Sequence, residues 1–155
     1  MVTSDEDEYG ISQSALSLLR TLEQDHAPAG PVSGGYLLCH GCGYPDIFGC
    51  PNFGTDWVVR HEGDTVVLSQ AAHYAAVPVG RADRLQETEF DVRARVPMDH
   101  YRRQVVAFAE EARDFYLASG PRQLEEGEQE FHQQFWAEFE ERMARAKAAE
   151  TGPSD

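Results

Sequence analysis

The sequence predicts an α+β fold, in which a small antiparallel sheet is flanked by an N-terminal helix and two C-terminal helices. Three patterns lead to this prediction. Apolar and charged residues alternate over residues 89–96, which is typical of a strand with one buried face. A glycine-containing turn at residues 61–64 separates two short runs of strand-forming residues. Segments near both ends of the chain carry apolar residues at helical spacing.

With 155 residues the chain is long enough to form one domain with its own core, and we assign that domain to residues 11–149. The acidic residues 1–10 and the short segment 150–155 are predicted to be disordered tails. The first helix follows the acidic tail, with Ser12 as its N-cap, and it ends before Pro28. Its apolar residues recur at helical intervals: Ile11, Ala15, Leu18, Leu19 and Leu22.

Residues 36–69 are predicted to form a cysteine-rich unit of strand, loop and hairpin. The run 36–39 is a short strand in this prediction. Residues 55–61 and 65–69 pair as the hairpin, and Gly63 supplies the positive φ angle of its turn. The intervening loop is rich in glycine and proline, so neither a helix nor a regular strand is expected there. The cysteines are the candidates for holding this loop in shape.

The segment 70–80 is predicted to contain a further strand, with Pro78 at a sheet edge or at an early end of the strand. The clearest strand is 89–96, and Pro97 ends it. We expect the apolar face of this strand to lie on the same core as the helix that follows. The strand residues concerned are Phe90, Val92, Ala94 and Val96, and the helix residues are Val105, Phe108 and Ala112.

Residues 99–149 are predicted to form two helices. Asp99 is the expected N-cap of the first, which ends at Gly120 and Pro121, and the second runs from about residue 123 or 127 to Ala149. The second helix carries an aromatic stripe, formed by Phe131, Phe135 and Phe139 with Trp136 beside them. We favour a core position for this stripe. The alternative is a partner-facing groove or the seam of a homodimer.

All three cysteines of the chain fall in the loop of the 36–69 unit. They are Cys39, Cys42 and Cys50. A structural zinc ion needs four thiolate or imidazole ligands, and we assign His61 as the fourth, with His40 and His73 as alternatives. Packing of the thiols beneath the loop is favoured over zinc, because one C-x-x-C pair with a lone third cysteine lacks the second pair of a strong zinc motif.

Catalytic uses of the cysteines are less well supported. The C-x-x-C pair is followed by Gly-Tyr-Pro, which does not start a helix, so a low-pKa redox pair is not predicted. Cys50 has His61 and His73 as candidate bases, but no cysteine-hydrolase signature surrounds it. Asp56 is interpreted as a turn or edge residue rather than an acid or base. The sequence contains no phosphate loop, dinucleotide fingerprint, H-E-x-x-H or zinc-deaminase pattern.

The net charge of −14 argues against nucleic acid or an anionic membrane surface as a partner and favours a basic protein. No run of apolar residues is long enough to predict a transmembrane helix. The N-terminus is acidic and does not have the pattern of a secretory signal. We therefore expect reduced cysteines and a location in a bacterial cytoplasm.

Cys42-Gly43, Gly49-Cys50 and Gly63-Asp64-Thr65-Val66 resemble a motif of small uncharacterised bacterial proteins, in which a CG-loop-GC segment precedes a GDTV hairpin. Some proteins of this build resemble immunity proteins encoded beside toxins. The resemblance implies a protein that neutralises a toxin or enzyme by direct contact, and the negative charge of the chain indicates that this partner is basic. The alternative is an enzyme or a metal or redox sensor that uses the cysteines. The resemblance does not supply the binding surface. We expect the irregular, glycine-rich and aromatic loop to bind the partner, because strands on both sides would hold it out, and the residues concerned are Tyr44, Asp46, Phe48 and Phe53.

Overall fold

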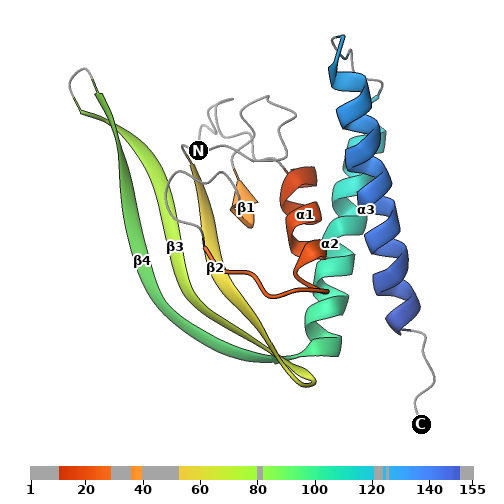
Figure 1. Ribbon diagram of the computed structural model, residues 1–155, viewed down its shortest axis with the longest axis horizontal. Helices are drawn as coiled ribbons and strands as arrows, with labels where there is room; N and C mark the ends of the chain where they lie inside the picture. Colours follow the sequence, from red (N-terminus) through yellow and green to blue (C-terminus); the bar gives the residue numbers. More distant parts are fainter. Residues whose placement is uncertain are drawn as a thin grey trace.

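The computed structural model describes residues 11–28, 36–39, 53–79, 82–120, 124 and 126–150. Four antiparallel strands form one sheet in the order β1-β2-β3-β4, and the helices lie on one side of it (Figure 1). The predicted α+β fold, with one N-terminal and two C-terminal helices, is confirmed. Of the predicted tails, residues 1–10 and 151–155 lie outside the described residues, and Glu150 ends the last helix. The elements are α1 (Ile11–Arg20), β1 (Leu38–Cys39), β2 (Phe53–Glu62), β3 (Thr65–Val79), β4 (Ala82–Pro97), α2 (Met98–Ala118) and α3 (Glu128–Glu150).

The predicted hairpin joins β2 to β3. Glu62 and Thr65 form its last pair, so the loop consists of Gly63 and Asp64. Gly63 has φ 65°, the left-handed conformation that a tight two-residue turn requires and that glycine adopts without strain. The local sequence is therefore sufficient to determine this turn.

Strand β3 runs without interruption through the segment where the sequence predicted a separate strand. Gln70 has φ 53° and lies where the register with both neighbouring strands shifts, which marks an irregularity of the bulge type. The pairing with β2 reaches Ala75, the partner of Phe53. Among the described strands only β4 pairs with β3 beyond that point, so Pro78 lies in the part of β3 that has one neighbour, as expected for proline.

The main core lies between the helices and the end of the sheet nearest to them (Figure 1). Each helix buries one apolar face in it, at intervals of three and four residues. Phe139 is fully buried, Phe135 is nearly so and Trp136 packs against them, which confirms the core interpretation for this part of the aromatic stripe on α3. Phe131 is only half-buried and is not a member of the core. The buried members are Ala15, Leu16, Leu19, Leu37, Val59, Val66, Tyr101, Val105, Ala109, Ala112, Phe135, Phe139 and Met143.

The apolar face of β4 is only partly buried, so the expectation that all of it faces the core is wrong. Val96 packs against the main core and Ala94 is partly buried. Phe90 is 46% exposed and Val92 is 48% exposed. Figure 1 shows β4 curving away from the helices beyond the point where it joins α2. Alternation in a sequence shows which residues share a face, but not how far the covering layer extends.

Two predicted helix caps are also wrong. Helix α1 already includes Ile11, so Ser12 lies inside its first turn. The N-cap of α2 is Pro97, which makes no side-chain capping bond, and Asp99 lies in the first turn of the helix. The predicted end of α2 is confirmed, because the helix stops at Ala118 just before Gly120, which has φ 80°. No helix in the described part of the chain is long and apolar enough to span a lipid bilayer.

Candidate functional site

The predicted site centres on the loop between β1 and β2, and the structure describes the two ends of that loop. Cys39 ends β1 and pairs with Gly54, while Phe53 begins β2. Both ends therefore lie on neighbouring strands, which are about 5 Å apart in an antiparallel sheet. The other predicted loop residues lie outside the described residues: Cys42, Tyr44, Asp46, Phe48 and Cys50.

Asp56 anchors the base of this loop. Its side chain is 1% exposed, and its Oδ1 atom lies 2.6 Å from Nε2 of His26. The same oxygen accepts hydrogen bonds from the backbone N–H groups of Leu37, at 3.3 Å, and Trp57, at 3.1 Å. A buried carboxylate is costly unless it is bonded in this way. Asp56 is therefore a buried anchor, and its interpretation as a turn or edge residue is wrong.

The anchor joins segments that are far apart in the sequence. His26 pairs with Val59 through two backbone hydrogen bonds of 2.8 and 2.9 Å, in addition to its side-chain contact with Asp56. Leu37 immediately precedes β1. Asp56 thus holds the chain that leaves α1 and the chain that enters the loop against the same strand. A lone aspartate inside a run of strand-forming residues is the sequence signal that could have identified it.

Two tyrosines form a second part of the loop base. The rings of Tyr36 and Tyr74 stack with centroids 5.0 Å apart and an interplanar angle of 16°. Both are buried together with Ala72. A Cβ atom on Gly54 would lie 2.2 Å from Cδ2 of Tyr36, so only glycine fits beneath the stacked rings. The base of the loop is accordingly packed as well as hydrogen bonded.

The register of the sheet separates His61 from the loop base. His61 lies seven residues along β2 from Gly54, the partner of Cys39. Seven residues of strand span roughly 20 Å, whereas zinc ligands lie about 2 Å from the ion. The imidazole of His61 instead contacts the carbonyl oxygen of Thr21, at 2.9 Å, and Asp25, at 3.5 Å. His61 is therefore not placed to share an ion with Cys39.

Another predicted alternative, His73, lies closer to the loop base. It pairs with Thr55, the residue next to Gly54, and its Nδ1 atom is 2.9 Å from the hydroxyl oxygen of Thr55. No group of three or more side chains suited to a metal occurs among the residues that the structure describes. Because Cys42 and Cys50 are not among them, zinc binding stays a prediction.

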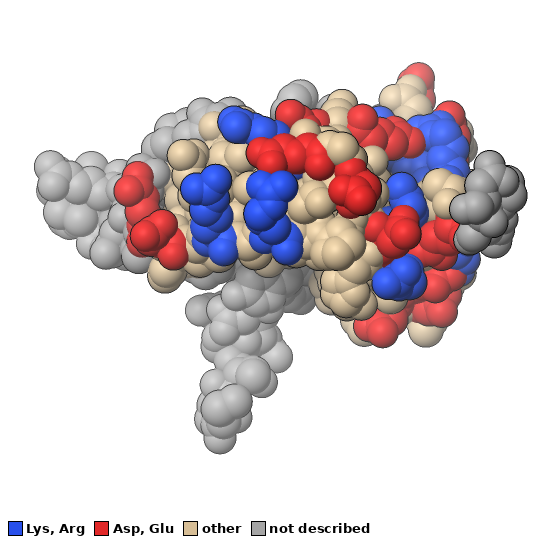
Figure 2. Space-filling view, turned by 90° about the horizontal axis from the view of Figure 1, so that it is seen from below, with Lys and Arg blue, Asp and Glu red and all other residues tan. Residues whose placement is uncertain are grey.

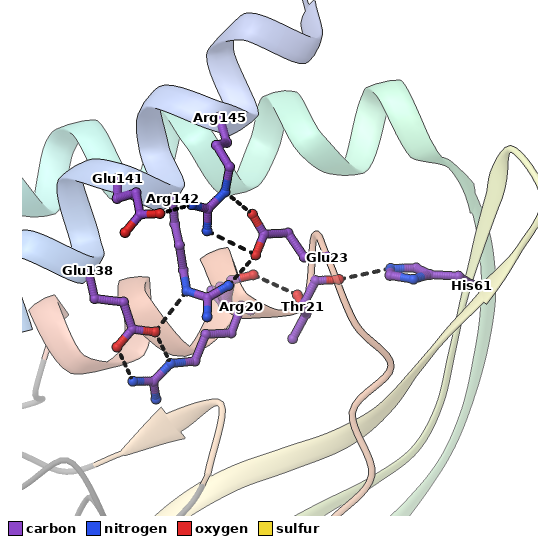
Figure 3. Close-up of polar contacts among 9 residues, drawn as sticks. Arg20, Thr21, Glu23, His61, Glu138, Glu141, Arg142 and Arg145 are labelled. Atoms are coloured by element: carbon purple, nitrogen blue, oxygen red, sulfur yellow. Dashed lines mark hydrogen bonds and ion pairs between the residues drawn. The ribbon is translucent and has the colours of Figure 1, made fainter.

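An ion-pair network fixes α1 to α3 beside the core (Figure 3). The guanidinium of Arg20 donates two hydrogen bonds to Glu138, at 2.8 and 2.7 Å, and Arg142 donates a third at 2.8 Å. Arg142 and Arg145 both contact Glu23, which follows α1. The hydrogen bond from Arg20 is the main cause that lowers the pKa of Glu138 from 4.5 to about 2. Glu138 therefore stays ionised well below the pH at which a glutamate usually titrates.

A buried hydroxyl pair completes the link between α1 and the rest of the molecule. The side-chain oxygens of Thr21 and Tyr101 are 2.7 Å apart. The backbone carbonyl oxygen of Thr21 is in contact with the imidazole of His61 on β2. Burial is the main cause that raises the pKa of Tyr101. The end of α1 is thus tied to α2, α3 and the sheet, which makes the helical layer and the loop base one connected structure.

The chain was compared with protein families, with curated proteins and with solved structures. No protein family, curated protein or solved structure matches the chain.

Proposed function

We propose that this protein acts in a bacterial cytoplasm by binding a basic protein, in the manner of an immunity or inhibitor protein that occludes a toxin or an enzyme. The contact surface in this proposal is the aromatic loop between Cys39 and Phe53. The single observation that carries the proposal is the buried anchor at Asp56, which holds the segment after α1 and the chain that enters the loop against β2. Binding loops are commonly presented by rigid scaffolds of this kind.

The polar chemistry at the loop base supports binding rather than catalysis. One oxygen of Asp56 receives three contacts, all from groups that belong to the scaffold. Its partner His26 is bonded through its backbone as well as its side chain. Asp56 and His26 are therefore engaged in fixing the chain that enters the loop. The alternative function, an enzyme or a metal or redox sensor, would have to use the cysteines of the loop.

The charge of the chain supports a basic partner. The net charge is −14, and basic side chains at the end of α3 are bound to carboxylates of the same chain. Lys147, for example, contacts Glu110 on α2. A negative surface attracts a basic partner at long range and raises the rate of association, and added salt reduces this effect. We expect the association rate to fall as the ionic strength rises.

The proposal is tested by isolating the partner from the native host and measuring its binding to loop variants. Phe48→Ala, alone and together with Tyr44→Ala, should weaken binding at least tenfold while leaving the melting temperature unchanged. Phe115→Ala is the matched control, because Phe115 is a 63% exposed aromatic residue of α2 and is not part of the loop sequence. Wild-type affinity of both loop variants would refute the loop as the contact surface. Early melting of these variants would instead place the aromatic residues in the core.

A further inference from the structure

Among the strands that the structure describes, β4 has a partner on its inner side only, so its outer edge is open. The sheet order ends at β4, and no other described strand pairs with its outer side. An edge strand presents a row of backbone N–H and C=O groups that can pair with another chain. Phe90 and Val92 of this strand are 46% and 48% exposed. The same stretch therefore combines free backbone groups with exposed apolar side chains.

The charged residues of this strand follow a particular order. Glu89 and Asp91 come first, and Arg93 and Arg95 follow, all exposed and all separated by apolar residues. Figure 2 views the molecule from below and shows acidic and basic side chains next to one another on its surface. Arg95 contacts Glu62 at 2.6 Å. No ion pair within the described part of the chain involves the other three.

This order is self-complementary in one register. Two copies of β4 that pair antiparallel about a two-fold axis place one residue opposite itself, and the remaining pairs follow from that choice where the outer side of the strand is regular. On the inner side of β4, Asp91 and Val92 lie opposite the single residue Gln70, so the dimer requires this irregularity to be confined to the pairing with β3. With Val92 on the axis, Asp91 faces Arg93 and Glu89 faces Arg95, twice each. Phe90 then faces the small Ala94, so that large and small apolar side chains alternate across the seam.

The neighbouring registers bring like charges together. An axis at Phe90 places Glu89 opposite Asp91, and an axis at Asp91 places that residue opposite itself. An axis at Arg93 likewise opposes two arginines. Like charges directly opposite one another destabilise a strand pair. Val92 is therefore the axis position that gives opposite charges at every charged pair of the stretch 89–95.

We propose that two copies of this chain associate through β4, with Val92 on the two-fold axis, so that the two sheets become one continuous sheet. Charged residues on an edge strand usually prevent such pairing, because identical edges meet with like charges. Here the acid-to-base order removes that barrier for an antiparallel copy. The overall charge of −14 opposes association, but its long-range effect is screened beyond about 8 Å at physiological salt, whereas the charge pairs at the seam are in contact.

Charge exchange tests this register. The wild-type chain should have twice its mass of 17.3 kDa in analytical ultracentrifugation. Asp91→Arg and Arg93→Asp should each weaken self-association about tenfold or more, because each places two like-charge pairs at the seam. The two variants mixed together should form a heterodimer, and the double exchange in one chain should restore the homodimer. Glu111→Arg and Arg103→Asp, exposed on α2, make the same charge changes away from β4 and should leave the dimer intact.

A cysteine scan supplies an independent measurement. In the proposed dimer the Cα atoms at position 92 of the two copies lie about 5 Å apart, within the range of a disulfide. Under mild oxidation, Val92→Cys should therefore form a larger amount of reducible covalent dimer than the wild-type chain does. Phe90→Cys should not, because the two copies of position 90 are offset by about 13 Å along the strands. A monomeric wild-type chain, or a dimer unaffected by both single charge variants, would overturn the proposal. Neither result would bear on the loop-binding function.

Discussion

Replacing Asp56 with alanine is the sharpest test of the loop anchor. The substitution removes the oxygen that accepts from Leu37 and Trp57, at 3.3 and 3.1 Å, and that contacts His26 at 2.6 Å. Each orphaned buried amide costs about 1–3 kcal/mol, and the partly exposed His26 can regain a water partner. We therefore expect Asp56→Ala to lower the free energy of unfolding by about 2–6 kcal/mol. This is a large part of the stability of about 5–15 kcal/mol that is typical of a domain.

Urea unfolding followed by circular dichroism measures this loss. With a slope of about 2 kcal/mol per molar urea, the midpoint should fall by about 1–3 M. Hydrogen exchange should show lost protection at the amides of Leu37 and Trp57. Asp99→Ala is the control, because the side chain of Asp99 is 79% exposed. A midpoint for Asp56→Ala within error of the wild-type value would refute the anchor.

A double-mutant cycle separates the contact between Asp56 and His26 from the hydrogen bonds that Asp56 accepts from the backbone. If Asp56 and His26 act together, Asp56→Ala and His26→Ala should be non-additive by about 0.5–3 kcal/mol in the free energy of unfolding. Additive effects would show that each side chain stabilises the fold independently. The same variants bear on function, because a loosened base should weaken partner binding even where the loop sequence is unchanged.

Three further predictions concern the core, the ion-pair network and zinc. Phe139→Ala should cost about 3–5 kcal/mol in thermal or urea unfolding, because the side chain is fully buried, whereas Phe115→Ala should stay within about 0.5 kcal/mol of wild type. Equal effects would contradict the assigned core. The pKa of Glu138 is lowered from 4.5 to about 2, so its stabilising contribution is complete above pH 4.5 and is lost as the pH falls from there toward 2. Glu138→Gln should remove this part of the acid dependence in pH-dependent unfolding, and an unchanged profile would argue against the network. If the cysteines hold zinc, elemental analysis should give close to one metal per chain and a chelator should lower the melting temperature. A metal content near zero would favour packed thiols.

The local sequence determined the elements that depend on short-range patterns. The hairpin turn follows from Gly63, and the end of α2 follows from Gly120, because both positions have positive φ angles that glycine adopts without strain. The aromatic stripe of α3 was assigned to the core from its spacing alone, and Phe139 is fully buried. In each case the physical cause lies within a few residues of the position concerned.

Only the tertiary structure decided which of these elements meet. Alternation placed Phe90 and Val96 on one face of β4, but the curvature of the sheet leaves the first exposed while the second packs on the core. The burial of Asp56 depends on His26 and on the segment before β1, which the sequence alone does not bring together. His61 was a plausible zinc ligand by its spacing from the cysteines, yet the register moves it roughly 20 Å along β2 from the partner of Cys39. Periodicity reports the face on which a residue lies, whereas its neighbours across the fold depend on strand register and on the extent of the covering helices, and these are set by contacts between residues far apart in the chain.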